Sequence, residues 1–156
     1  MNKLYTETLL YLFPKIDARI NCINEKSIKL GFGSMRNKIF ESIELMYQLC
    51  KEKFIYMIIK NAINVIKNRL SVQQINLLEY KYFRNDNMIL DKDFDHTSRN
   101  YFRRQNALLK RFSESFELLD FTNEFFEKEC LKYKFISALL NNVQTGEIKY
   151  VRNYER

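Results

Sequence analysis

Residues 97–112 carry a run of basic side chains that no acidic residue interrupts. Arginine can donate paired hydrogen bonds to guanine, asparagine can pair with adenine, and lysine and arginine both attract phosphate. If the segment is a helix, its first two turns would meet base edges in a major groove and its later turns would meet phosphates. The base-facing candidates are Ser98, Arg99, Asn100 and Arg103, and the phosphate-facing candidates are Arg104, Lys110 and Arg111. The alternative interpretation is a solvated basic face on an ordinary core helix.

Positive charge is concentrated in one part of the chain rather than spread along it. The net charge of +7 and the isoelectric point near 9.3 fit a polyanionic partner, although chains from AT-rich genomes commonly show the same excess of lysine. Residues 114–129 are acidic, with Lys128 as their only basic residue. Because carboxylates repel phosphate, we expect this stretch to lie off a nucleic acid and to serve packing or partner contact.

The basic run has the sequence signals of a helix. Thr97 is a suitable N-cap residue. Apolar side chains recur at a spacing that would bury one side of the helix, at Tyr101, Leu108, Leu109 and Phe112. The segment is therefore predicted to be a helix that begins at Thr97 and ends at Phe112.

A second helix is predicted upstream. Ser71 and Gln74 match a capping box, in which the Ser71 hydroxyl accepts from the Gln74 amide and the Gln74 side chain accepts from the Ser71 amide. The helix should begin at Val72 and stop at the polar loop of residues 84–87. A short element at residues 88–94 would follow, with a turn leading into the basic helix.

Residues 70–112 read LSVQQINLLEYKYFRNDNMILDKDFDHTSRNYFRRQNALLKRF. This segment, about a quarter of the chain, resembles the promoter-reading C-terminal region (region 4) of bacterial sigma-70 factors and the small phage-type transcription regulators built on it. Those families combine a capped, leucine-rich helix, a short helix, a tight turn and a recognition helix that opens with Ser or Thr. The short element departs from their Ile-Ala-x-x-Leu-Gly run, with Asp95 in the glycine position. The resemblance implies a helix-turn-helix that binds double-stranded DNA, with RNA polymerase as a partner.

The N-terminal part of the chain is predicted to form long helices. Residues 4–30 have apolar side chains at a mostly helical spacing that Pro14 interrupts, so a kink or a new helix is expected there. Residues 31–34, Gly-Phe-Gly-Ser, are predicted to be a loop, with Ser34 as the next N-cap. Residues 35–69 should follow as one long helix.

The long helix at residues 35–69 carries an apolar stripe that needs a covering partner. The stripe consists of Ile39, Ile43, Met46, Cys50, Phe54, Met57, Ala62, Val65 and Ile66. A helix of this length usually lies in a coiled coil or against another long helix. Either the first segment folds back on it, or a second copy of the chain forms a homodimer through it.

The fold class predicted from these elements is all-α, because three glycines and one proline leave few turn signals. Two further helices are expected at residues 115–129 and 131–142, followed by a loose tail at residues 147–156. The chain thus divides into an N-terminal helical hairpin or bundle for partner or dimer contact, the helix-turn-helix, and C-terminal helices with a tail, at residues 1–69, 70–112 and 113–156.

The sequence offers little for catalysis or metal binding. His96, the only histidine, lies at a predicted turn, so neither a zinc site nor a catalytic pair can be assembled from histidines. Asp91, Asp93 and Asp95 lack the glycine and the distal glutamate of a calcium loop. We therefore expect no enzyme activity, no catalytic residue, no metal and no cofactor.

The cysteines and the hydropathy pattern bear on the compartment. Cys22, Cys50 and Cys130 are far apart and odd in number, so they are predicted to be reduced, buried apolar side chains. The most apolar window, residues 54–66, contains Lys60 and is shorter than the roughly 20 apolar residues of a membrane span. We expect a cytoplasmic protein, bacterial or phage-encoded and nucleoid-associated, with no membrane contact.

The leading hypothesis is a sequence-specific double-stranded DNA-binding transcription regulator or sigma-like factor, with recognition helix 97–112 in the major groove. Residues 1–69 and 113–142 would then bind RNA polymerase or a second protomer. One alternative is a non-enzymatic helical protein-interaction module without DNA binding. Another is an RNA-binding helical module. Salt-dependent binding to duplex DNA separates the leading hypothesis from the interaction module.

Overall fold

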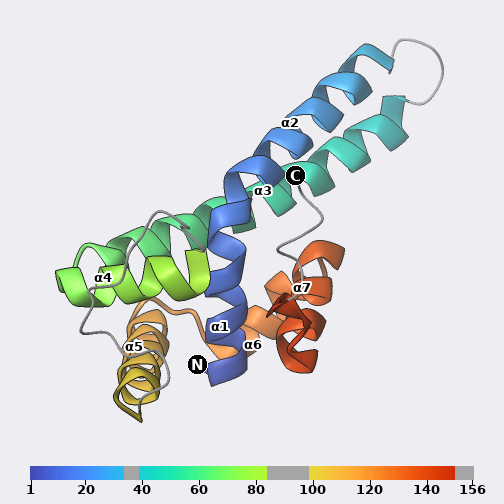
Figure 1. Cartoon of the computed structure of the whole chain (residues 1–156). Coiled ribbons are helices and arrows are strands. Elements are labelled where there is room, and N and C mark those ends of the chain that lie inside the picture. Colours follow the sequence, from blue (N-terminus) through green and yellow to red (C-terminus); the bar gives the residue numbers. More distant parts are fainter. Residues whose placement is uncertain (34–38, 84–98, 150–156) are drawn as a thin grey trace.

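The protein is built from helices alone in the part of the chain that its computed structural model describes, residues 1–33, 39–83 and 99–149 (Figure 1). The longer helices are α1 (Lys3–Leu12), α2 (Ile16–Gly33), α3 (Ile39–Lys67), α4 (Val72–Leu78), α5 (Arg99–Leu118) and α7 (Lys134–Thr145). The shorter helical turns are η1 (Phe13–Lys15), η3 (Glu79–Phe83), α6 (Asn123–Phe125), η4 (Phe126–Cys130) and η5 (Glu147–Lys149). The predicted all-α fold is confirmed over these residues.

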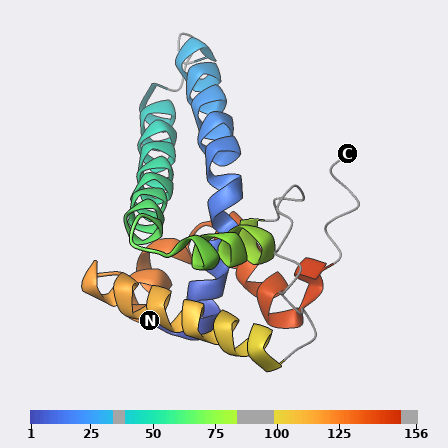
Figure 2. The same cartoon turned by 60° about the vertical axis from the view of Figure 1, so that its left-hand side comes forward.

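Helices α2 and α3 form an antiparallel hairpin that projects from the rest of the molecule in both views (Figures 1 and 2). Pro14 lies in the turn η1 that separates α1 from α2, as its lack of an amide hydrogen predicts. Polar pairs join the two arms: Lys60 Nζ lies 2.6 Å from Asp17 Oδ1, and Lys53 Nζ donates to Asn24 Oδ1 at 2.8 Å. The first segment therefore folds back on the long helix, as one of the two sequence predictions proposed.

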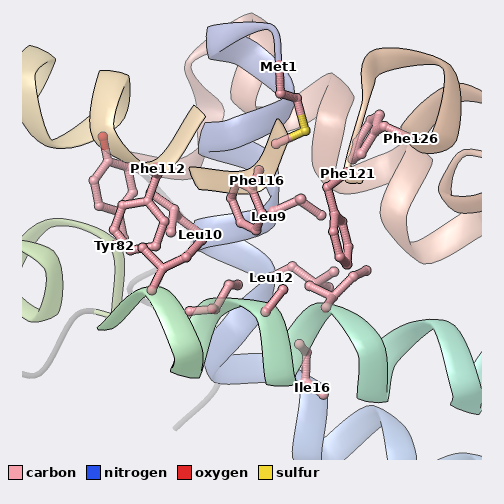
Figure 3. Packing of buried hydrophobic residues seen from close by; sticks show 14 of the residues in the cluster. Met1, Leu9, Leu10, Leu12, Ile16, Tyr82, Phe112, Phe116, Phe121 and Phe126 are labelled. Atoms are coloured by element: carbon pink, nitrogen blue, oxygen red, sulfur yellow. The ribbon is translucent and has the colours of Figure 1, made fainter. Parts of the chain in front are cut away.

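Helix α1 is the centre of the body, where it packs against both α5 and α7. Figure 3 shows its Leu9, Leu10 and Leu12 close to Phe112 and Phe116 of α5. All five side chains are fully buried, and burying a side chain of this size contributes about 1.5–3 kcal/mol. Helix α1 thus holds the sequence-distant helices α5 and α7 together.

The three regions named from the sequence share one hydrophobic core. The buried cluster runs from Met1 to Ile148 and includes side chains from α1, α3, α4, α5 and α7. Ile148 lies in η5, within the segment predicted to be a loose tail, and its burial corrects that prediction for residues 147–149. Residues 150–156 lie outside the described part.

Predicted helix boundaries are wrong in three parts of the chain. The predicted loop at residues 31–34 is helical as far as Gly33. A glycine costs a helix only about 1 kcal/mol, which the rest of a long helix can tolerate. The helix predicted for residues 115–129 does not begin at Ser115, since α5 continues to Leu118. The break falls instead at residues 119–122, where Asp120 has a φ of 62° and Thr122 caps the next helix. The last long helix is α7, three residues later than predicted at each end.

The long helix α3 buries Ala62 and Ile66 of the predicted stripe, but most of its buried face differs from the one predicted. Its buried residues are Ile55, Tyr56, Ile59, Ala62, Ile63 and Ile66. Most of the predicted stripe is exposed, namely Ile39, Ile43, Cys50, Phe54, Met57 and Val65. Spacing alone could not choose between the two because α3 carries apolar side chains on two faces. The exposure of Cys50 also corrects the prediction that all three cysteines are buried; Cys130 is buried and Cys22 is half-buried.

Candidate nucleic-acid interface on helix α5

Helix α5 buries one apolar face in the core. The residues whose spacing predicted this face are all buried, namely Tyr101, Leu108, Leu109 and Phe112. Phe116, one turn further on, is also fully buried and continues the same face. This added contact explains why α5 ends at Leu118 rather than at Phe112.

The predicted capping box at the start of α4 is confirmed. Its Gln74 side chain also accepts a hydrogen bond from α5. Gln74 N donates to Ser71 Oγ at 3.3 Å, and Ser71 N donates to Gln74 Oε1 at 3.1 Å. Arg111 of α5 donates to the same Gln74 Oε1 at 2.9 Å and to the backbone carbonyl of Arg69 at 2.6 Å. Both guanidinium NH2 groups of Arg111 are therefore engaged within the chain. Arg111 thus joins α5 to the start of α4, and its phosphate-facing role stays a prediction.

Tyr82 of η3 contacts the N-terminal half of α5 through a hydrogen bond with Gln105. Its ring is fully buried, and its hydroxyl accepts from Gln105 Nε2 at 3.3 Å and lies 3.5 Å from Glu7 Oε1. Burial raises the pKa of the Tyr82 hydroxyl far above its ordinary value. The hydroxyl thus stays protonated and ties together η3, α1 and α5.

The N-terminus of the chain anchors the other end of α5. The Met1 ammonium forms an ion pair with Glu117, and the Met1 carbonyl accepts a hydrogen bond from Ser113 Oγ. Burial lowers the pKa of this ammonium. Helix α5 is therefore fixed along its length, by Tyr82, by the capping box and by Met1.

Arg99, Arg103 and Lys110 project from the side of α5 that faces away from the core, where their spacing places them in one row. All are exposed, and we call these residues the basic face. Arg103 Nη2 donates to Asn100 Oδ1 at 3.4 Å, and Lys110 Nζ lies 3.7 Å from Glu114 Oε1. Both contacts are exposed and local, so they leave the side chains accessible to a ligand.

The remaining predicted site residues lie around this face. Asn100 is exposed in the first turn of α5. Arg104 is exposed on the flank of the helix, next to Arg103. Ser98 lies outside the described residues. The structure thus brings Arg99, Asn100, Arg103, Arg104 and Lys110 to one accessible helix.

The order of charges along α5 is the reverse of the order that stabilises a helix. The first turn contains no acidic residue and the last turn no basic residue; instead Arg99 opens the helix and Glu117 lies near its end. The helix dipole favours acids at the N-terminus and bases at the C-terminus by about 0.3–1 kcal/mol per charge. Helix stability therefore does not account for the basic face.

Lys3 of α1 adds a cation beside the basic face that was not predicted from the sequence. Its Nζ donates to Asn106 Oδ1 at 3.1 Å, on the side of α5 that carries Arg99 and Lys110. The two residues are far apart in the sequence, and only the packing of α1 on α5 brings them together. No local pattern could have revealed this cation.

The acid-rich stretch 114–129 has intramolecular partners besides Met1. Tyr5 donates its hydroxyl hydrogen to Glu127 Oε1 at 2.9 Å, and Lys128 Nζ donates to Glu124 Oε1 at 2.5 Å. These contacts lie among α1, α6 and η4, away from the basic face. Glu114 differs, since it pairs with Lys110 of the basic face. That the stretch lies off a nucleic acid stays a prediction.

Within the part of the chain that the structure describes, no group of three or more His, Cys, Asp or Glu could hold a metal ion. None of the described helices combines the length and the hydropathy needed to cross a membrane. No protein-family model, no curated protein and no solved structure matches the chain. The sigma-70 resemblance therefore rests on residues 70–112 alone.

Proposed function

We propose that the chain is a sequence-specific regulator of transcription that binds double-stranded DNA through helix α5. The observation that carries the proposal is the basic face, which stands opposite a fully buried apolar face and which helix stability does not explain. A helix with this division of side chains fits a major groove, because arginine reads guanine edges and lysine attracts phosphate.

The anchoring of α5 supports a reading role. Tyr82, Arg111 and Met1 hold the helix at successive points, so little ordering entropy is lost when it binds a ligand. Arg99, Asn100 and Arg103 lie in its first two turns and are assigned to base edges. Ser98 keeps its predicted base-facing role, although it lies outside the described residues.

Phosphate contact is assigned to the residues that border these turns. Lys110 lies on the same row, about two turns further on, where a recognition helix leaves the groove. Arg104 lies on the flank, and Lys3 adds a cation from α1. Arg111 is left out of this group because its guanidinium is engaged by Gln74 and by the Arg69 carbonyl.

The first experiment selects bound duplexes from a random pool, with the purified chain alone and again with RNA polymerase added. Enrichment with the chain alone is the result expected of an independent regulator. Enrichment only with polymerase indicates a sigma-like factor. A pool that enriches in neither arm overturns the proposal.

The second experiment measures the affinity of variants for the selected duplex and for random DNA by fluorescence anisotropy. Arg99→Ala and Arg103→Ala should each cost about 1–3 kcal/mol on the selected site and much less on random DNA. Lys110→Ala should weaken both about equally and reduce the salt slope by roughly one unit. The matched control is Lys128→Ala, which removes the same charge from the acid-rich side and should change neither affinity.

A helical protein-interaction module is the second candidate, and the exposed apolar residues of the α2–α3 hairpin favour it. The two candidates differ in their ligand and in its dependence on salt. Binding to duplex DNA that weakens steeply with salt supports the regulator. Absence of binding to any duplex or RNA, with a protein partner retained on the hairpin, supports the interaction module.

A further inference from the structure

Helix α3 carries a second apolar face that nothing in the described chain covers. Its members are Phe40, Ile43, Tyr47, Cys50, Phe54 and Met57, and we call them the α3 seam. Every one is exposed, and Phe40 at the start of the seam is 87% exposed. Soluble monomers rarely leave so long an apolar row in water, and such rows commonly mark interaction sites.

The spacing of the α3 seam is that of a coiled coil. Its successive members are three, four, three, four and three residues apart. This is the heptad pattern in which the alternating positions insert as knobs into holes of a facing helix. The α2-facing side of the same helix carries Glu52, Lys53 and Lys60, whose side chains contact α2. This side lies well away from the seam around the helix axis. Helix α2 therefore leaves the seam open.

We propose that the α3 seam pairs with the seam of a second copy of this chain, with the two helices antiparallel. In a two-fold arrangement, Phe40 lies opposite Met57 of the partner subunit, and Ile43 lies opposite the partner's Phe54. Tyr47 lies opposite the partner's Cys50. Every member of the seam then has a partner, because a two-fold interface presents the same patch on both subunits.

The charges beside the seam select the antiparallel direction. Glu44 and Lys51 occupy equivalent flanking positions one heptad apart, on the side away from α2. The antiparallel pairing brings Glu44 opposite the partner's Lys51, and symmetry repeats the contact. A parallel pairing would place the partner's Lys51 beside Met46 instead, with no ion pair.

Both flanking side chains are available for this contact. Lys51 Nζ lies 4.2 Å from the centre of its own Tyr47 ring, and Glu44 Oε1 accepts a hydrogen bond from Gln48 at 2.8 Å. Both arrangements are local and exposed, and each keeps the charged group beside the seam. The projecting hairpin also leaves the two bodies at opposite ends of an antiparallel pair (Figure 1). The inference does not rest on DNA binding by α5.

The test measures the molar mass and the dimer dissociation constant of the full chain by sedimentation over a dilution series. The wild type should sediment as two chains, and Phe54→Glu should raise the dissociation constant roughly 100-fold or more. Leu118→Glu is the matched control, since Leu118 is 83% exposed on α5 and receives the same charge; it should leave the constant unchanged. Because Phe54 and Leu118 are both exposed, circular dichroism should show intact helices in each variant.

A charge exchange tests the direction. Glu44→Lys should weaken the dimer about 3- to 10-fold, and adding Lys51→Glu to it should restore the wild-type constant. A wild type that sediments as one chain at every concentration overturns the inference, as does a dimer that Phe54→Glu leaves intact. If Phe54→Glu raises the dimer dissociation constant but the charge exchange leaves it unchanged, the antiparallel pairing is overturned.

Discussion

Helices α3 and α5 are both long, and both bury one apolar face in the same core, but their opposite faces differ. On α5 the outward residues are Arg99, Arg103 and Lys110. On α3 they include Phe40 and Phe54, which are 87% and 62% exposed. Folding uses one face of each helix in the same way. The composition of the other face is therefore the better guide to what each helix binds.

The difference implies opposite physical forces at the two surfaces. Binding at the basic face would be driven by charge and by release of counterions, which salt suppresses. Binding at the α3 seam would be driven by burial of apolar surface, which simple salts do not suppress. One chain would then carry two surfaces that respond differently to the same change of solvent.

The largest expected effect tests the buried faces of α3 and α5, which pack in the same core. Leu108→Ala and Ile59→Ala should each lower the free energy of unfolding by about 2–5 kcal/mol, since both side chains are buried and each change leaves a cavity. Phe54→Ala is the exposed comparison and should change it by less than about 0.5 kcal/mol. Urea denaturation at low protein concentration measures all three. A loss below roughly 1 kcal/mol for Leu108→Ala would show that the buried face of α5 is wrongly assigned.

Local signals in the sequence predicted much of α4 and α5. The Ser71–Gln74 capping box and the buried row beginning at Tyr101 depend on residues a few positions apart, and both are confirmed. The predicted end of α5 at Phe112 was wrong because the buried row continues to Phe116, which is fully buried in the core shared with other helices.

Contacts between distant segments could not be predicted. The role of Arg111 depends on Arg69 and Gln74, and Lys3 meets α5 only after α1 has packed. In α3, two apolar faces satisfied the same helical periodicity, so the sequence predicted a stripe without showing which face folds inward. The basic residues of the candidate site were therefore predictable, whereas the supports that hold α5 were not.

The second effect sharpens the contrast between the two surfaces. A fivefold rise in salt should weaken binding of the selected duplex by about 20- to 300-fold, for roughly two to four neutralised phosphates. The dimer dissociation constant should change by less than about threefold over the same range, because only the Glu44 and Lys51 contacts are screened. Anisotropy and sedimentation in matched buffers measure the two quantities. Equal salt dependence at both surfaces would show that the same force drives binding at both.

A smaller effect separates two neighbouring cations of α5. Arg111→Ala should lower the free energy of unfolding by about 1–2 kcal/mol through loss of its charge-assisted hydrogen bonds to Gln74 and Arg69. Lys110→Ala, its adjacent control, should cost only about 0.3–0.5 kcal/mol through its exposed pair with Glu114. Thermal or urea unfolding of both variants gives the comparison. If Arg111→Ala instead leaves stability unchanged and lowers the DNA salt slope by about one unit, Arg111 contacts phosphate as the sequence first predicted.

The smallest effect concerns Tyr82, the buried support of α5, and appears only at alkaline pH. Its neighbours are Gln105, Glu7 and core side chains, and burial raises the pKa of its hydroxyl. In the unfolded chain this hydroxyl ionises near pH 10; above that pH the unfolded state loses a proton that the folded state keeps, so stability falls as pH rises. Below pH 10 the hydroxyl is protonated in both states, so it adds no pH dependence to the free energy of unfolding.

The Tyr82 hydroxyl can be tested by removing it. Between pH 8 and pH 11, Tyr82→Phe should lose roughly 1 kcal/mol less stability than the wild type. Tyr47→Phe on the exposed seam should match the wild type. Urea unfolding at the two pH values tests this, and equal losses in all three chains would mean that the Tyr82 hydroxyl reaches water and does not fix α5.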